Sequence, residues 1–174
     1  MRIVEPQTNF TIRAWQTERF TDVQFSHRVP AVKWDYFTQR MRPLADEPAG
    51  TIWSALFAGV GRPFHPRLSR GWMGQVFKNS TRVQGSDLRA GESVEEALSA
   101  ILDWEPSAAV FLVYVPTQVY TASWADVLDC FRRGWLPIDT LVMCSESSAR
   151  VAVFWEGFGP YFANRGTRDL VKRI

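Results

Sequence analysis

The feature that most constrains the fold is a continuous apolar run, AVFLVYV, at Ala109–Val115. It has the length of a single strand and is rich in β-branched and aromatic residues, which predicts a central strand of a sheet. Two further strands are expected at Asp139–Cys144 and Arg150–Trp155, because the Ser-Glu-Ser-Ser turn between them favours a hairpin. A short strand at Tyr161–Ala163 would extend this meander.

Four segments have the apolar spacing of helices. The clearest begins after Ser93, a good N-cap residue, and ends near Trp104, with Glu95 and Glu96 near the positive end of the helix dipole. The other three are Val32–Met41, Glu47–Ala58, and a helix that starts after Thr121 or Ser123 and ends at Arg132 and Arg133, before Gly134. In contrast, Arg2–Arg28 mixes β-branched and aromatic residues and predicts short strands or irregular structure.

Together these patterns predict an α+β fold, with a mainly antiparallel sheet of four to six strands packed against three or four helices. The 174 residues are 46% hydrophobic and 22% charged, which is typical of a globular protein. No repeat, low-complexity tract or proline-rich linker divides the chain, so we expect a single globular domain over residues 1–174. No apolar stretch reaches the roughly 20 residues that cross a bilayer. Because Met1–Phe10 also lacks the layout of a signal peptide, we expect a soluble protein with no membrane partner.

Residue types that carry common chemistries are sparse. Cys130 and Cys144 are too few for a disulfide framework and too far apart for a metal knuckle, so both are expected to be reduced, buried and inert. His27 and His65 have no Cys or His at metal-ligand spacing. The chain also lacks the G-x-S-x-G, P-loop, G-x-G-x-x-G and H-E-x-x-H motifs. We therefore expect no cofactor and no metal, and the pattern favours a protein that is not an enzyme.

A basic segment, Gly59–Gly85, contains the loop GRPFHPRLSRGW at Gly61–Trp72. His65 could act there as a general base, with nearby arginines stabilising negative charge, as in a phosphodiesterase or nuclease. The same loop could serve a nucleic-acid-binding accessory protein, although a net charge of +2 is too small for a dedicated nucleic-acid binder. It could also be a solvated loop that pairs with acidic residues or binds a protein. The loop residues that we consider candidates for binding are Arg62, His65, Arg67, Arg70 and Trp72.

An acidic segment follows the basic one. The carboxylates of Glu92, Glu95 and Glu96 could contact a basic protein partner, so they complete the set of candidate protein-binding residues. Alternatively, the segment is an ordinary amphipathic helix with a solvated face. The sequence leaves both interpretations open.

Two parts of the chain carry a resemblance to known families. MRPLADEPAGTIWSAL, at Met41–Leu56, is similar to the N-terminal helical signature of a family of small proteobacterial domains. The succession of the Trp124–Trp135 helix, the IDTLVM strand and the segment Val151–Gly166 resembles the C-terminal half of small bacterial immunity proteins from polymorphic toxin systems. This resemblance implies a cytoplasmic antidote, without catalysis or cofactor, that binds a cognate toxin and blocks its active site.

The resemblance carries over no site residues, because the interfaces of immunity proteins diverge together with their toxins. The chain also departs from the strongly acidic immunity proteins that neutralise basic nucleases, since its net charge is +2. A nuclease toxin would therefore have to contact the local acidic helix.

Overall fold

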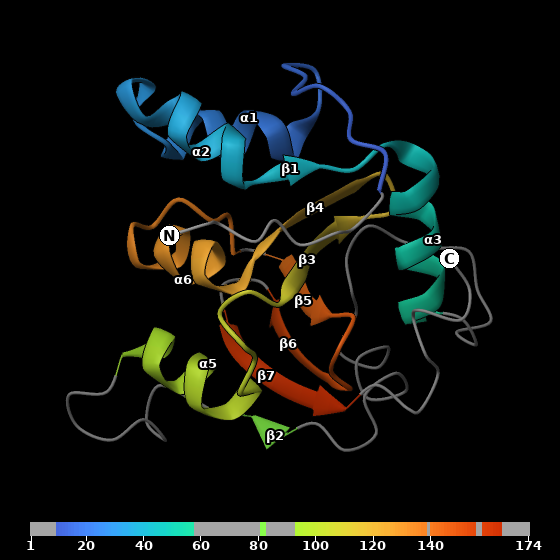
Figure 1. The fold of residues 1–174 in the computed structure, drawn as a ribbon, viewed down its shortest axis with the longest axis vertical. Coiled ribbons are helices and arrows are strands. Elements are labelled where there is room, and N and C mark those ends of the chain that lie inside the picture. Colours follow the sequence, from blue (N-terminus) through green and yellow to red (C-terminus); the bar gives the residue numbers. More distant parts are fainter. Residues whose placement is uncertain (1–9, 58–80, 83–92, 139, 156–157, 165–174) are drawn as a thin grey trace.

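The computed structural model describes residues 10–57, 81–82, 93–138, 140–155 and 158–164 (Figure 1). These residues form an α+β fold. Its helices are α1 (Phe20–Arg28), α2 (Trp34–Arg40), α3 (Asp46–Phe57), α5 (Val94–Leu102) and α6 (Trp124–Arg132), with a 3-10 helix at Ala31–Lys33 before α2. Its strands are β1 (Arg42–Pro43), β2 (Thr81–Arg82), β3 (Ala109–Val115), β4 (Gln118–Ser123), β5 (Thr140–Ser145), β6 (Arg150–Trp155) and β7 (Phe158–Asn164).

The strands form one antiparallel sheet in the order β1-β4-β3-β5-β6-β7-β2. The strand that the apolar run predicts, β3, lies inside the sheet, with β4 on one side and β5 on the other. Cys144 pairs with Phe111 on β3 and with Val151 on β6, which fixes the register of the central strands. The two-residue strands β1 and β2 form the edges of the sheet, where they pair with β4 and β7.

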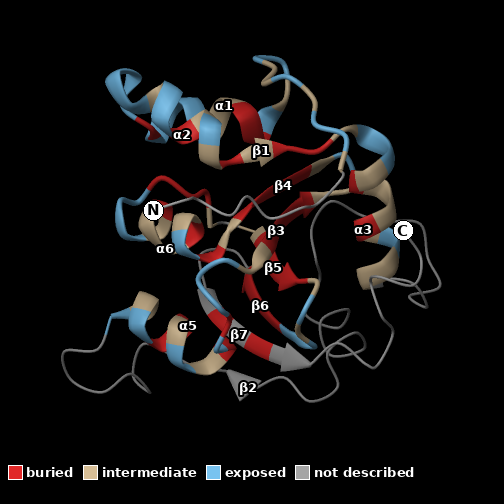
Figure 2. Cartoon of the chain, viewed as in Figure 1, coloured by how far each residue is buried: buried red, intermediate tan, exposed pale blue. Residues whose placement is uncertain are grey.

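Both faces of the sheet are buried, each against its own helices. Successive side chains of a strand point to opposite faces, so Val110, Leu112 and Tyr114 of β3 enter one core cluster while Phe111 and Val113 enter the other. Helices α1, α2, α5 and α6 supply residues to the first cluster, whereas α3 packs on the second (Figure 1). The outward sides of the helices are exposed (Figure 2). Burial on both faces explains why the central strands are continuous apolar runs without polar alternation.

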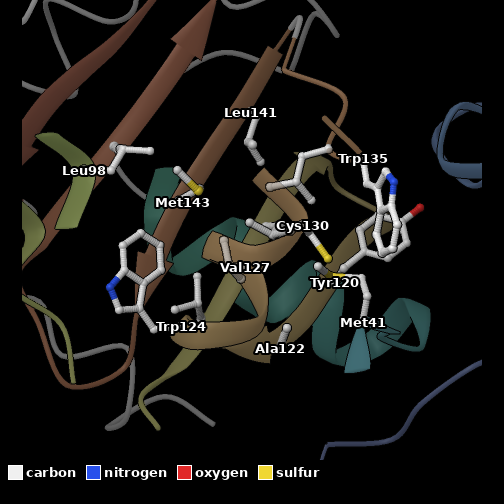
Figure 3. Close-up of a cluster of buried hydrophobic side chains, with 14 of the residues drawn as sticks. Met41, Leu98, Tyr120, Ala122, Trp124, Val127, Cys130, Trp135, Leu141 and Met143 are labelled. Carbon is white, nitrogen blue, oxygen red and sulfur yellow. The ribbon is translucent and has the colours of Figure 1, made fainter. Parts of the chain in front are cut away.

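The first core cluster is centred on α6. Trp124, Val127 and Cys130 lie on the buried side of this helix, among sheet residues such as Leu141 and Met143 (Figure 3). Because these three α6 positions follow a spacing of three residues, they share one face of the helix. This face anchors α6 and directs its opposite side to solvent.

Local sequence signals begin and end α5 and α6. In α5, the Ser93 side chain accepts a hydrogen bond from the Glu96 amide while the Glu96 side chain accepts one from the Ser93 amide, which is a capping box. At the start of α6, the Ser123 side chain accepts a hydrogen bond from the Asp126 amide. Helix α6 ends where Gly134 adopts a positive φ of 69°. The Gly134 amide donates to the Phe131 carbonyl, and the Trp135 amide donates to the Cys130 carbonyl.

Most predicted elements are confirmed. The α+β class, the antiparallel sheet, the β5–β6 hairpin, β7, α2, α3, α5 and α6 all occur where the patterns placed them, and β3 has the predicted bounds. The sheet has five strands of six or seven residues plus the two short ones. The described residues contain five α-helices, one more than the upper expectation.

Two predictions for local structure are wrong. Phe20–Arg28 forms helix α1 although irregular structure or strands were expected there, and β4 occupies Gln118–Ser123, where only a helix start was expected. The expected end of α3 at Gly59 and Gly61, and most of the basic segment, lie outside the described residues.

Candidate functional site

The structure places two of the eight candidate binding residues. Glu95 and Glu96 lie in the first turn of α5. The other six, namely Arg62, His65, Arg67, Arg70, Trp72 and Glu92, lie outside the described residues. The geometry therefore bears on the acidic helix and not on the basic loop.

The two carboxylates of α5 have different partners. Glu96 is exposed and closes the capping box with Ser93. Glu95 binds Arg132 of α6, whose Nε donates to both carboxylate oxygens at 3.1 Å and whose Nη2 also donates to Oε1. The carboxylate of Glu95 thus links α5 to α6 and already has a positively charged partner.

A second set of contacts links α6 to α2. Nε of Arg40 lies 3.3 Å from Oδ1 of Asp126, and Nε of Arg133 donates to Oδ2 of Asp129 at 2.9 Å. The hydroxyl of Tyr36 donates to the same oxygen of Asp129 at 3.4 Å. The hydrogen bond from Arg133, together with its charge, lowers the pKa of Asp129. Asp129 is therefore held as a carboxylate between two helices.

Aromatic rings hold two of these arginines in place. The guanidinium of Arg40 lies 3.7 Å from the ring centre of Tyr36, and that of Arg133 lies 5.0 Å from the ring centre of Trp135. Tyr36 and Trp135 contact each other edge to face, with centroids 6.4 Å apart. Stacking of this kind fixes a guanidinium plane over a ring.

These contacts define one continuous feature on the outside of α2, α6 and α5, which we call the arginine surface. Its members are Tyr36, Arg40, Glu95, Asp126, Asp129, Arg132 and Arg133, and the buried ring of Trp135 packs beside Arg133. The sequence pattern placed Arg132 and Arg133 only at the end of a helix. The spacing of Asp129 and Arg133 by four residues was a readable signal within α6. The ion pair between α5 and α6 had no such signal in the sequence, because Glu95 and Arg132 are 37 positions apart.

A buried polar network lies beneath α1. Arg13 donates from Nη1 and Nη2 to the two carboxylate oxygens of Asp22, at 2.6 and 2.8 Å. Asp22 also accepts a hydrogen bond from the Gln16 amide at 2.7 Å and one from the Tyr120 hydroxyl. Only 8% of the Arg13 side chain and 3% of the Asp22 side chain are exposed. Burial acts to raise the pKa of Asp22, but the hydrogen bonds from Arg13, Tyr120 and Gln16 outweigh it and lower that pKa.

This network has a structural role. It joins the segment before α1 to strand β4, which carries Tyr120. Trp15 stacks on the Tyr120 ring with centroids 5.4 Å apart, and Arg13 lies 5.7 Å from the centre of the same ring. Burial and the hydrogen bond to Asp22 raise the pKa of Tyr120, so its hydroxyl stays protonated and donates. The arrangement holds a charge pair inside the fold and fastens α1 to the sheet.

Both cysteines are free and buried, as predicted. Burial, together with the nearby carboxylates of Asp129 and Asp126, raises the pKa of Cys130 to about 12. A thiol with such a pKa is protonated at neutral pH and is a poor nucleophile. Cys144 lies in the second core cluster, on the other face of the sheet.

Two features are absent from the described part of the chain. Among these residues, no group of three or more His, Cys, Asp or Glu side chains is arranged to hold a metal ion. None of the helices formed by these residues is both long and apolar enough to span a membrane. Comparison of the chain with protein-family models, with curated proteins and with solved structures finds no match.

Proposed function

We propose that the protein works by binding another protein, as a cytoplasmic immunity protein that binds and inhibits a cognate bacterial toxin. The arginine surface carries this proposal. It exposes Tyr and Arg, two of the residue types that most often dominate the binding energy of protein interfaces, beside the buried ring of Trp135. These side chains are held by ion pairs and ring contacts across three helices.

Preorganisation is the physical reason why such a surface suits binding. Association costs about 0.5–1.5 kcal/mol for each flexible side chain that becomes immobilised. Arg40 and Arg133 are already fixed by a carboxylate and an aromatic ring before a partner arrives. A partner that docks here therefore loses less of its contact energy to ordering.

The roles of the most perturbed titratable groups also favour binding over catalysis. Arg13 and Asp22 neutralise each other inside the fold while Tyr120 donates a hydrogen bond to Asp22, and Cys130 is packed on the buried face of α6. Each of these groups has a structural task within the described residues. The resemblance to immunity proteins then supplies the class of partner, a toxin domain.

The test is co-purification of the tagged full-length chain with the products of its adjacent genes. The captured complex is washed in high salt before the bound proteins are identified. We expect a stoichiometric protein with a toxin domain, whose expression kills cells unless this chain is co-expressed. Purification of the chain alone, together with failure to protect cells from every adjacent gene product, would refute the proposal. An activity of the purified chain that is lost in His65→Ala would instead favour the phosphodiesterase or nuclease alternative.

A further inference from the structure

The arginine surface also indicates the chemistry of its partner. Resting on the proposed function above, we infer that the toxin contacts Arg40, Arg132 and Arg133 through an acidic protein surface. The sequence suggested the opposite polarity, in which the carboxylates of α5 meet a basic partner. The inference follows from which member of each ion pair lies on the outside.

In each of the three pairs, the arginine side chain is more exposed than the carboxylate side chain. The side chain of Arg132 is 64% exposed while that of Glu95 is 18% exposed. The exposed fraction of the side chain is 43% for Arg133 and 24% for Asp129, and it is 35% for Arg40 and 29% for Asp126. The carboxylates of Glu95 and Asp129 thus lie inside Arg132 and Arg133, whereas Arg40 and Asp126 are about equally exposed. An approaching molecule meets the arginines first.

The arginines keep donors for a second acceptor. Arg133 contacts Asp129 through Nε, and a guanidinium has five N–H donors in a planar fork. Ring stacking leaves the edge of the guanidinium plane open to bidentate pairing with a carboxylate. Ala125, which is exposed one turn before Asp129 on α6, adds a small side chain that allows close approach. Carboxylates on the partner can therefore reach the same guanidinium groups from outside.

The inner carboxylates argue for a protein rather than a nucleic acid. Affinity for nucleic acid comes largely from a net positive charge that neutralises phosphates and releases counterions. Here three arginines alternate with Glu95, Asp126 and Asp129, so the spaced charges suit single carboxylates of a polypeptide better than the evenly charged backbone of a nucleic acid. Individual carboxylates at matched positions on a folded protein can pair with single guanidinium groups, and Tyr36 supplies a partly exposed ring beside them.

The primary experiment uses the adjacent-gene toxin domain and isothermal titration calorimetry. The double variant Arg132→Gln/Arg133→Gln removes two outer charges, and Arg28→Gln/Lys33→Gln removes two exposed charges at the α1–α2 turn as a matched control. We expect the first to weaken binding at least about 10-fold and the control to change it less than about 2-fold. A steric pair tests the same point without touching charges: Ala125→Trp should weaken binding, and Ala149→Trp, in the exposed β5–β6 turn, should not.

The outcomes separate the inference from the proposed function. If the toxin binds the wild-type chain and both test variants equally well, the inference is overturned and the proposed function stands. If no adjacent gene product binds, the proposed function fails, and NMR of the full chain decides the inference. The arginine Nε–Hε signals are then followed with poly-L-glutamate of about 20 residues and with oligothymidylate of about 20 nucleotides. Saturable shifts at Arg132 and Arg133 with polyglutamate support the inference. No shift, or tighter binding of the oligonucleotide there, overturns it.

Discussion

Replacement of Asp22 by Asn tests the buried network with the smallest change in shape. Asp22 accepts four hydrogen bonds, of which two come from Arg13, one from the Gln16 amide and one from the Tyr120 hydroxyl. The variant turns one acceptor oxygen into a donor that faces these donors, and it leaves the Arg13 charge buried without its counter-charge. Loss of one partner of a buried ion pair costs about 3–5 kcal/mol. A domain has a total stability of about 5–15 kcal/mol, so this cost is a large fraction of the whole.

The free energy of unfolding is measured by urea titration, followed by tryptophan fluorescence and far-UV circular dichroism. Asp35→Asn, on the exposed side of α2, is the matched control and should change stability by less than about 0.5 kcal/mol. A loss below about 1 kcal/mol for Asp22→Asn would refute the argument, because the buried charge of Arg13 would then be tolerated without its partner.

An apolar replacement of the whole network separates the charge penalty from packing. The triple variant Arg13→Met/Asp22→Leu/Tyr120→Phe removes both charges and the hydroxyl together. Replacing a complete buried ion pair by apolar residues is often neutral or stabilising, so the triple variant should be more stable than Asp22→Asn. A triple variant that is less stable than the single one would show that packing around Trp15 and Tyr120, and not the charge, dominates.

The network of Arg13, Asp22 and Tyr120 also makes the free energy of unfolding depend on pH. The pKa of Asp22 in the folded protein is lowered from its ordinary value, which is about 3.9 for a free Asp. A lowered folded pKa gives stability that is present above the unfolded pKa and is lost as the pH falls through the folded one. We therefore expect the contribution of Asp22 to be intact at neutral pH and to decline progressively as the pH falls below about 4. Unfolding free energies measured from pH 7 to pH 2 should decline less steeply in Asp22→Asn than in the wild type.

Three further predictions concern the helix ends and the thiols. Ser93→Ala should cost about 1 kcal/mol in the same urea assay, because it removes the α5 capping box, and a cost near zero would contradict that assignment. Gly134→Ala should lower the free energy of unfolding by about 1–2 kcal/mol because of the positive φ alone, since no atom lies within 4 Å of an added Cβ. Gly50→Ala is the contrast: it lies inside α3, its added Cβ also meets no atom within 4 Å, and it should not destabilise the protein. Cys130 and Cys144 should react with Ellman's reagent only after denaturation, and rapid reaction of either thiol in the native protein would contradict their burial.

The elements that the sequence predicted correctly are those whose signals are local. Strand β3 is a short apolar run, and α5 has both a capping box and a clear apolar face. The turn between β5 and β6 and the glycine after α6 are likewise signals within a few residues. Each of these elements is specified by neighbours in the sequence, so no knowledge of the tertiary structure is needed to find it.

Helix α1 was missed because its buried face carries Thr21 and Asp22 beside the apolar Phe25. Asp22 can occupy that face because it accepts a hydrogen bond from Tyr120. Tyr120 comes from a strand 98 positions away, so the sequence near Asp22 gives no sign of this partner. A carboxylate at a core position breaks the apolar periodicity that marks a helix. The N-cap residue, Arg19, also makes no side-chain cap. The helix therefore depends on tertiary contacts that no local pattern reports.

Strand β4 was missed for a different reason. It follows β3 after only two residues, Pro116 and Thr117, which lack the Asn-Gly or Asp-Gly signature of a tight hairpin. Its last residue, Ser123, is also the N-cap of α6, so the cap signal was visible while the strand before it was not. Pairing with β3 along most of its length then selects the extended conformation.

The polarity of the arginine surface shows why a charge run is a poor guide to a binding partner. From the sequence, Glu95 belongs to an acidic helix that follows a basic segment, which suggests a negative surface. In the structure, Arg132 lies over Glu95, and α6 is oriented this way because Trp124, Val127 and Cys130 hold its opposite face in the core. The sign of the charge that a partner meets is thus set by helix packing, which places one charged side chain above another. For this chain, helix packing places arginine side chains where an acidic contact was expected, so the charge of the partner is a measurable consequence of how α6 is buried.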